Sequence, residues 1–233
     1  MFYYYGAKRM FAKQWGRPSR PLIIEPFAGS AAYSMFWLGA VDKVLLIEKD
    51  PRVVELWQRL LAMTPREVLA LEPPVAGDYT DDFLWMTAAT SNAIGSLRRL
   101  KMPERVPEVA RGMLRQIAAT LPEAKRKVTV IEGDYLEAPD VEATWFIDPP
   151  YQVNGSGSEH TWFPQGMGYG HGCRSSDLDF AALGEWCQSR QGQVMVCEQS
   201  GATWLPFTSL GDSKEAGWRN NDVAGTLFHQ PLK

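Results

Sequence analysis

Long apolar runs and paired cysteines are both missing from this sequence. No stretch of 18 consecutive apolar residues occurs, so no membrane-spanning helix is expected. Residues 1–5 lack the basic start and the apolar core of a secretory signal. The three cysteines, Cys173, Cys187 and Cys197, are an odd number without CxxC spacing. These features favour a reducing compartment, and we expect a cytoplasmic protein without a disulfide framework.

Basic charge is scarce overall but concentrated in two segments. The net charge of −3 argues at first against a nucleic-acid partner. Residues 98–127, however, carry a local net of +6 and residues 8–20 a local net of +5, so the rest of the chain carries −14. A chain polarised in this way can present basic surface to phosphates. We expect the nucleic acid to be bound by Arg98, Arg99, Lys101 and Arg105.

Apolar runs alternate with helical patterns along most of the chain. Asp50-Pro51 supplies a helix N-cap followed by proline at the first helical position. The alternation indicates one α/β domain over residues 1–233 with a parallel sheet, and residues 203–229 favour a closing hairpin. The predicted strands lie at 21–25, 43–47, 127–131, 143–147 and 193–197, and the predicted helices at 30–39, 51–63 and 177–189.

Two segments interrupt this pattern. Residues 75–125 contain no strand signal, and Pro103, Pro107 and Pro122 predict several short helices there. This small helical insert carries most of the concentrated basic charge, so it is our candidate for the nucleic-acid-facing lobe. Residues 155–172 contain six glycines among polar residues, which is typical of a mobile loop.

A glycine-bearing turn and an acidic residue predict a nucleoside-containing cofactor. Residues 25–31 (EPFAGSA) lie between a predicted strand and a predicted helix, so backbone N–H groups can face a ligand. Glu48 ends the next strand, 19 residues after Gly29, where a carboxylate can accept hydrogen bonds from ribose hydroxyls. No GxGxxG fingerprint is present, which disfavours a nicotinamide dehydrogenase.

The most specific signal is Asp148-Pro149-Pro150-Tyr151, directly after an apolar strand. Two prolines remove two N–H donors and fix the backbone, so a rigid turn offers carbonyl acceptors. An aspartate beside such a carbonyl can accept both hydrogens of an –NH2 group, which directs the nitrogen lone pair at an electrophile. Tyr151 supplies a face on which an extruded base can stack.

Together these motifs resemble the Dam-type N6-adenine DNA methyltransferases. Residues 4–8 (YYGAK) resemble their N-terminal cofactor motif, residues 25–31 their (D/E)PFxGxG loop, and residues 148–151 their catalytic DPPY. Gly133-Asp134-Tyr135 resembles the motif whose aspartate contacts the cofactor's adenine. The order of motifs also matches. Two departures are that Ala31 replaces the loop's second glycine and that the insert is short.

The resemblance implies a fold, a cofactor and a partner. The fold is a Rossmann-like class I methyltransferase sheet, the cofactor S-adenosylmethionine, and the partner double-stranded DNA, with neither a metal nor a membrane involved. Asp148, Pro149, Pro150 and Tyr151 would be catalytic. The implied cofactor-binding residues are Tyr5, Gly6, Lys8, Glu25, Phe27, Ala28, Gly29, Ser30, Glu48, Asp134 and Tyr135.

Several alternatives stay open at the level of sequence. DPPY-like strand ends also serve adenine N6 or guanine N2 in ribosomal RNA, and N4-cytosine methylation is chemically equivalent. An alternative that is not an enzyme is a DNA-binding module with a decayed cofactor pocket. This interpretation rests on Ala31 alone. A cytosine-C5 enzyme is disfavoured because none of the three cysteines follows proline.

Overall fold

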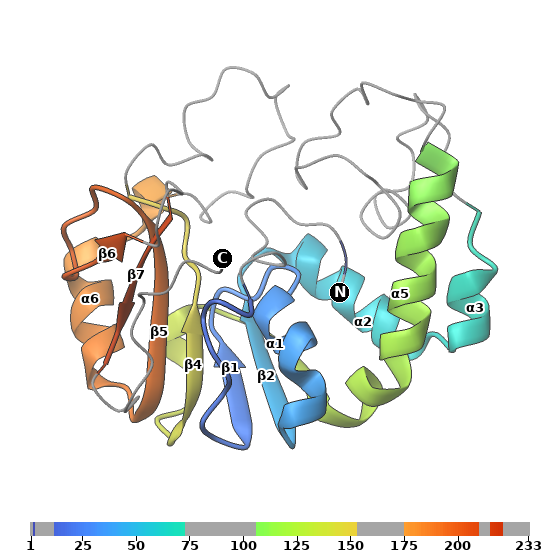
Figure 1. Cartoon of the computed structure of the whole chain (residues 1–233), viewed down its shortest axis with the longest axis horizontal. Coiled ribbons are helices and arrows are strands. Elements are labelled where there is room, and N and C mark those ends of the chain that lie inside the picture. The colour runs from blue at the N-terminus through green and yellow to red at the C-terminus, as the bar shows by residue number, and fades with distance from the viewer. Residues whose placement is uncertain (1, 3–11, 73–105, 153–174, 210–214, 221–233) are drawn as a thin grey trace, which may run out of the picture.

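The computed structural model describes residue 2 and residues 12–72, 106–152, 175–209 and 215–220 (Figure 1). These segments form a seven-stranded sheet in the order β3-β2-β1-β4-β5-β7-β6. Adjacent strands are parallel from β3 to β5, whereas β7 runs antiparallel to both β5 and β6. The strands are β1 (Leu22–Glu25), β2 (Lys43–Glu48), β3 (Val128–Glu132), β4 (Ala143–Ile147), β5 (Gly192–Gln199), β6 (Thr208–Ser209) and β7 (Glu215–Arg219).

This strand order, with β7 reversed next to β5, is that of the Rossmann-like class I methyltransferase sheet. The fold expected from the sequence is therefore confirmed, as are the five parallel strands and the closing hairpin. The helices are α1 (Ala32–Trp37), α2 (Pro51–Ala62), α3 (Pro65–Leu69), α5 (Val106–Lys127) and α6 (Phe180–Ser189), with 3-10 turns at Leu38–Ala40 (η1), Tyr135–Glu137 (η3) and Ser175–Asp177 (η4). In the described part of the chain, no helix is long and apolar enough to cross a membrane.

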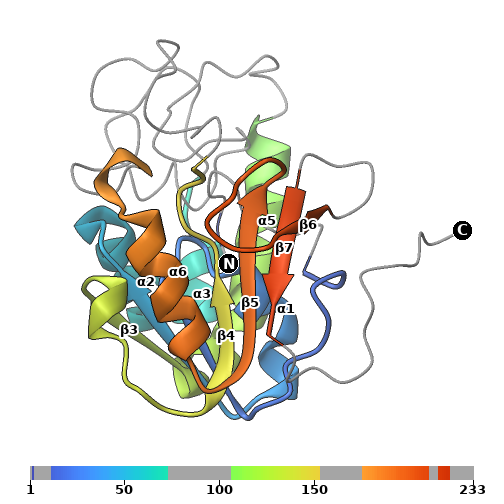
Figure 2. The same cartoon turned by 90° about the vertical axis from the view of Figure 1, so that its left-hand side faces the viewer.

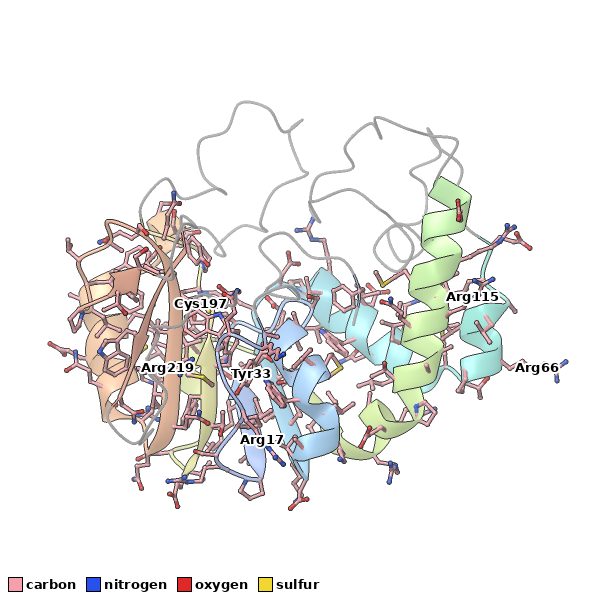
Figure 3. The ribbon with its side chains drawn as sticks, viewed as in Figure 1. Arg17, Tyr33, Arg66, Arg115, Cys197 and Arg219 are labelled. Carbon is pink, nitrogen blue, oxygen red and sulfur yellow. The ribbon has the colours of Figure 1, made fainter. Side chains whose placement is uncertain are left out.

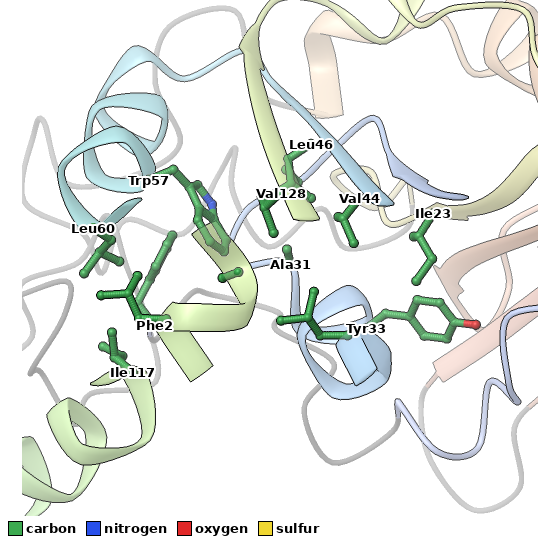
Figure 4. Packing of buried hydrophobic residues seen from close by; sticks show 14 of the residues in the cluster. Phe2, Ile23, Ala31, Tyr33, Val44, Leu46, Trp57, Leu60, Ile117 and Val128 are labelled. Carbon is green, nitrogen blue, oxygen red and sulfur yellow. The ribbon is translucent and has the colours of Figure 1, made fainter. Parts of the chain in front are cut away.

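The helices cover the sheet from two sides (Figure 2). Alternate residues of each strand point to opposite faces, so Ile23 and Ile24 enter different core clusters. One face packs against α1, α2, α3 and α5, and Figure 4 shows Trp57, Leu60 and Ile117 converging on this cluster. The other face packs against α6. Parallel strands buried on both faces explain the continuous apolar runs in the sequence.

Side-chain caps fix where the predicted helices begin. Asp50 accepts the backbone N–H of Arg52 and Pro51 takes the first helical position, so α2 starts where the sequence predicts. Thr64 and Glu67 form a capping box at α3. Asp179 accepts the N–H groups of Ala181 and Ala182, so α6 starts at residue 180, three residues later than expected.

The segment 75–125 divides into two parts. Residues 73–105 lie outside the described residues, whereas Val106–Lys127 forms the single helix α5 with Pro122 inside it. The expectation that Pro107 and Pro122 separate short helices is wrong over this part. The helix continues because it buries one apolar face in the main core, through Met113, Leu114, Ile117, Ala118, Leu121 and Ala124.

Some basic residues of this segment have structural partners. Lys125 donates from Nζ to the carbonyl oxygens of Ala62 and Met63, at 3.3 and 3.1 Å, at the end of α2. Lys127 donates to the carbonyl oxygen of Leu38 at 2.9 Å. Cations at helix ends stabilise the unpaired carbonyl groups there. Part of the local charge therefore serves the fold rather than a nucleic acid.

The segment before β1 covers the side of the sheet that α1 leaves open. Tyr33 stacks on Phe146 with centroids 4.4 Å apart, and Trp15 meets the same ring edge-on at 5.6 Å. Arg219 of β7 donates to the carbonyl oxygens of Gln14 and Trp15. Figure 3 shows Tyr33 and Arg219 on the same side of the sheet. These contacts fix residues 14 and 15 across β4 and β7.

Candidate active site

The strand order places the candidate site between β1 and β4. The chain winds from β1 outward to β2 and β3, and then returns to β4 on the other side of β1. At such a switch point, the loops after neighbouring strands diverge and leave a crevice at the carboxyl edge of the sheet. Ile24 pairs with Trp145, so Glu25 at the end of β1 and Asp148 directly after β4 lie at that edge. The two most informative sequence motifs therefore lie side by side.

The turn after β1 is tied to the end of β2. The backbone N–H of Ala28 donates to the carbonyl oxygen of Ile47 at 3.1 Å. The N–H of Gly29 donates to Glu48 Oε2 at 2.8 Å. From α2, the indole Nε1 of the fully buried Trp57 donates to the Gly29 carbonyl oxygen at 2.8 Å. Three contacts thus hold the turn against its neighbours before any ligand binds.

The backbone conformation of Ala31 is of the kind that usually requires glycine. Gly29 and Ala31 have φ values of 47° and 49°, both in the left-handed region that favours glycine. Ala31 thus holds a conformation that glycine adopts readily, although an L-residue is strained there by about 1–2 kcal/mol. Its methyl group is buried in the main core, as Figure 4 shows. The turn therefore holds a left-handed backbone at position 31 with alanine in place.

Glu48 is held at the end of β2 with its carboxylate almost buried. It is 7% exposed and accepts the N–H groups of Gly29 and Asp50, the latter at 2.9 Å on Oε1. Burial raises the pKa of Glu48, and these backbone hydrogen bonds oppose the rise. A carboxylate has about four acceptor positions. Some acceptor capacity therefore remains, as the sequence predicts for a ribose.

Glu25 has a structural role in addition to any contact with a ligand. It is 2% exposed, and its Oε1 accepts the N–H of Ser34 in the first turn of α1 at 2.8 Å. Ala31 at the N-cap of α1 has no side-chain oxygen, so Glu25 performs the capping from β1. Burial raises the pKa of Glu25 to about 7, and the nearby Asp148 carboxylate adds to the rise.

The turn after β3 completes this side of the site. The N–H of Gly133 donates to the Glu48 carbonyl oxygen at 3.0 Å. Asp134 forms a capping box with Glu137 at η3, and its Oδ2 accepts Lys49 Nζ at 2.8 Å. From the first turn, Phe27 stacks on Tyr135 with centroids 5.5 Å apart. The structure therefore brings together three of the four segments that the sequence assigns to the cofactor, including the buried Ala28 and Ser30.

Asp148-Pro149-Pro150-Tyr151 leaves β4 at the same edge. Asp148 is partly exposed, Pro149 is buried, and Pro150 and Tyr151 are half-buried. The ring of Tyr151 packs against the main core cluster. The Asp148 charge raises the pKa of Glu25 on one side and of Glu198 on the other, in both cases after burial as the larger cause. Asp148 therefore lies near carboxylates from both neighbouring strands.

Two residues of the site were missed by sequence reasoning. Glu198 follows the predicted strand 193–197 just as Glu48 follows its own strand, so the same rule applied to β5 finds it. Trp57 carries no comparable signal, because its contact with Gly29 depends on how α2 packs against the turn.

Several predicted site residues lie outside the described residues. They are Tyr5, Gly6 and Lys8 of the N-terminal cofactor motif and Arg98, Arg99, Lys101 and Arg105 of the candidate nucleic-acid lobe. Their roles remain predictions. Within the described segments, no group of three or more His, Cys, Asp or Glu side chains could hold a metal ion.

Comparison with known proteins adds little to this geometry. No protein-family model and no curated protein matches the chain. Among solved structures, the chain is similar to the rRNA methyltransferase aviRa from Streptomyces viridochromogenes, with 14% identity and a TM-score of 0.43 over 91% of this chain and 82% of that one. So distant a likeness supports no argument about function, and the fold assignment rests on the strand order and directions above.

Proposed function

We propose that this chain transfers a methyl group from S-adenosylmethionine to an exocyclic amine of a nucleic-acid base. The observation that carries the proposal is the adjacency of two turns at the carboxyl edge of the sheet. The Gly29 turn follows β1, and the Asp148–Tyr151 turn follows β4, its hydrogen-bonded neighbour. One turn has the features of a nucleoside cofactor site, and the other has the acceptors needed to orient an amine.

The residues at this edge suit the proposed cofactor. Glu48 retains acceptor capacity for ribose hydroxyls, while Asp134 and the Phe27–Tyr135 stack lie beside it at the expected adenine end. Glu25 and Asp148 add carboxylates where the β1 and β4 segments meet. S-adenosylmethionine supplies an electrophilic methyl group on a positively charged sulfur.

The role of the catalytic turn is to orient the acceptor nitrogen. The Asp148 carboxylate and the Pro149 carbonyl oxygen would each accept one hydrogen of the amine, so that the nitrogen lone pair points along the transfer direction. Tyr151 would stack on the base, which must be extruded from a duplex at a cost of a few kcal/mol. Alignment of this kind can contribute about 7–11 kcal/mol to catalysis.

We propose adenine N6 in DNA as the target, because the order and identity of the motifs resemble the Dam-type enzymes. A ribosomal RNA base, at adenine N6 or guanine N2, is the second candidate, since the same turn can orient either amine. One solved structure of similar fold is that of an rRNA methyltransferase. That activity belongs to that protein, and the likeness is too distant to decide the substrate here.

One experiment tests both candidates. The protein is expressed in cells without endogenous adenine methylation, and nucleosides from their DNA and ribosomal RNA are analysed by mass spectrometry. N6-methyladenine in DNA alone supports the main proposal, and a new methylated base in ribosomal RNA alone supports the second. The absence of any new methylated base in either polymer, with the protein folded and S-adenosylmethionine present, would contradict base methylation.

A further inference from the structure

Glu198 occupies an unusual position for an acidic residue. It is the penultimate residue of β5, two positions beyond Val196, which pairs with Ile147 at the end of β4. Its side chain is fully buried, at 0% exposure. In the described part of the chain, no basic side chain forms an ion pair with it. A buried carboxylate without a cation needs hydrogen bonds to keep its charge.

Three N–H groups supply these hydrogen bonds. Oε2 accepts the backbone N–H of Gln152 at 3.0 Å and the indole Nε1 of Trp204 at 2.8 Å. Oε1 accepts the N–H of Gln199 at 2.8 Å. A return contact joins the same segments, because the N–H of Thr203 donates to Gln152 Oε1 at 3.4 Å.

The Gln152 contact matters because of the two prolines before it. Pro149 and Pro150 have no N–H to donate, so they cannot tie the turn to the sheet by backbone donation. Gln152 follows the turn directly, and its N–H connects the turn to β5. The carbonyl of Pro149 and the side chain of Asp148 therefore depend on a fixed downstream end for their direction.

We propose that Glu198 is a positioning residue that fixes the Asp148–Tyr151 turn for the methyl transfer proposed above. A role as the base that removes the amine proton fits less well, because both carboxylate oxygens already accept N–H groups within the core. Trp204 extends the same connection to residues 203–207, where its ring packs against Phe180 and Phe207. The turn, the end of β5 and this segment thus form one hydrogen-bonded unit.

The first test measures order rather than activity. Hydrogen–deuterium exchange of the wild-type protein and Glu198→Gln is followed for the amide of Gln152 and for peptides from β2. A glutamine offers one acceptor oxygen and adds an NH2 group among three donors, so exchange at Gln152 should accelerate at least tenfold with β2 unchanged. Unchanged exchange at Gln152 would overturn the proposal.

The second test separates positioning from general damage. For Glu198→Gln, we expect kcat to fall at least tenfold while the Kd for S-adenosylmethionine changes less than twofold. A proportional loss of both would indicate a merely structural role and overturn the proposal. If the variant fails to fold, Trp204→Phe, which removes one donor and keeps an aromatic side chain, should give a smaller acceleration at Gln152; no acceleration would again count against it.

The hydrogen–deuterium exchange experiment also distinguishes a failure of this inference from a failure of the proposed function. If the wild type transfers no methyl group but exchange at Gln152 still accelerates in Glu198→Gln, the methyltransferase proposal fails and the positioning role, as an element of catalysis, falls with it. If transfer occurs but exchange and kcat are unaffected by the substitution, the function stands and the role of Glu198 does not.

Discussion

Glu48 accepts the backbone N–H of Gly29 at 2.8 Å, which joins the turn after β1 to the end of β2. The same carboxylate accepts the N–H of Asp50 through its other oxygen. One side chain therefore stabilises the turn and faces the place where the ribose is expected. Binding and stability should be linked at this residue.

We expect Glu48→Gln to lose both properties. Glutamine has one acceptor oxygen, so a buried N–H of Gly29 or Asp50 is left without a partner, which costs about 1–3 kcal/mol in the free energy of unfolding. The Kd for S-adenosylmethionine should rise at least tenfold by calorimetry. Glu132→Gln is the matched control, because Glu132 pairs with Glu48 in register but is exposed. Equal affinity in Glu48→Gln and wild type would contradict the assignment.

The buried Glu25 predicts a pH dependence of stability. Its pKa lies at about 7 in the folded protein against 4.5 for an unperturbed glutamate, so the folded state binds the proton more tightly. Stability from this group is full below pH 4.5 and is lost as the pH rises through 7. The loss amounts to about 3 kcal/mol.

Glu25→Gln isolates this effect, because the amide stays neutral at every pH. The free energy of unfolding, measured in denaturant between pH 4.5 and 8, should fall by about 3 kcal/mol more in the wild type than in the variant. Glu48 and Glu198, whose pKa values are also raised, are present in both proteins and cancel in the comparison. Parallel pH profiles would show that Glu25 does not titrate in this range.

Ala31 should tolerate glycine unusually well. Relief of the left-handed conformation, about 1–2 kcal/mol, offsets the loss of a buried methyl group and the added freedom of the unfolded chain. We expect Ala31→Gly to remain within about 1 kcal/mol of the wild type. Ala118→Gly, buried inside α5, has no strain to relieve and should lose more. Similar losses at the two positions in denaturant titrations would argue against strain at Ala31.

The basic segment outside the described residues makes a separate prediction. Replacing Arg98, Arg99 and Lys101 with glutamine should weaken nucleic-acid binding and lower the slope of log K against log salt by about 3, if each contacts one phosphate. Replacing the exposed Arg111 and Arg115 of α5 provides the comparison. A slope unchanged by the triple substitution would show that these three residues do not contact phosphates.

Local pattern was enough to predict the elements that position the site. The apolar strands and the Asp50-Pro51 start of α2 follow from interactions within a few residues, so the sequence indicates them directly. Motif identity then located Glu48 and Asp148 at the ends of β2 and β4, the two strands that flank β1. The single helix α5 could not be predicted in this way, because its apolar contacts with the sheet outweigh the break expected at Pro122.

The same distinction applies to the site itself. Glu25 caps α1 and is electrostatically coupled to Asp148. Both roles depend on the three-dimensional path of the turn, which local sequence does not specify. The contact of Trp57 with Gly29 depends on helix packing. Glu198, in contrast, carries a readable signal, since an acid directly after the apolar run 194–197 is expected at the carboxyl edge.

Asp148→Ala provides the most direct test of the central claim that Asp148 orients the acceptor amine. Transfer of labelled methyl from S-adenosylmethionine to duplex DNA and to ribosomal RNA is measured for the wild type and the variant, together with the Kd for the cofactor. We predict that transfer to the substrate polymer falls to background while the Kd changes little. Undiminished transfer by Asp148→Ala would contradict the account.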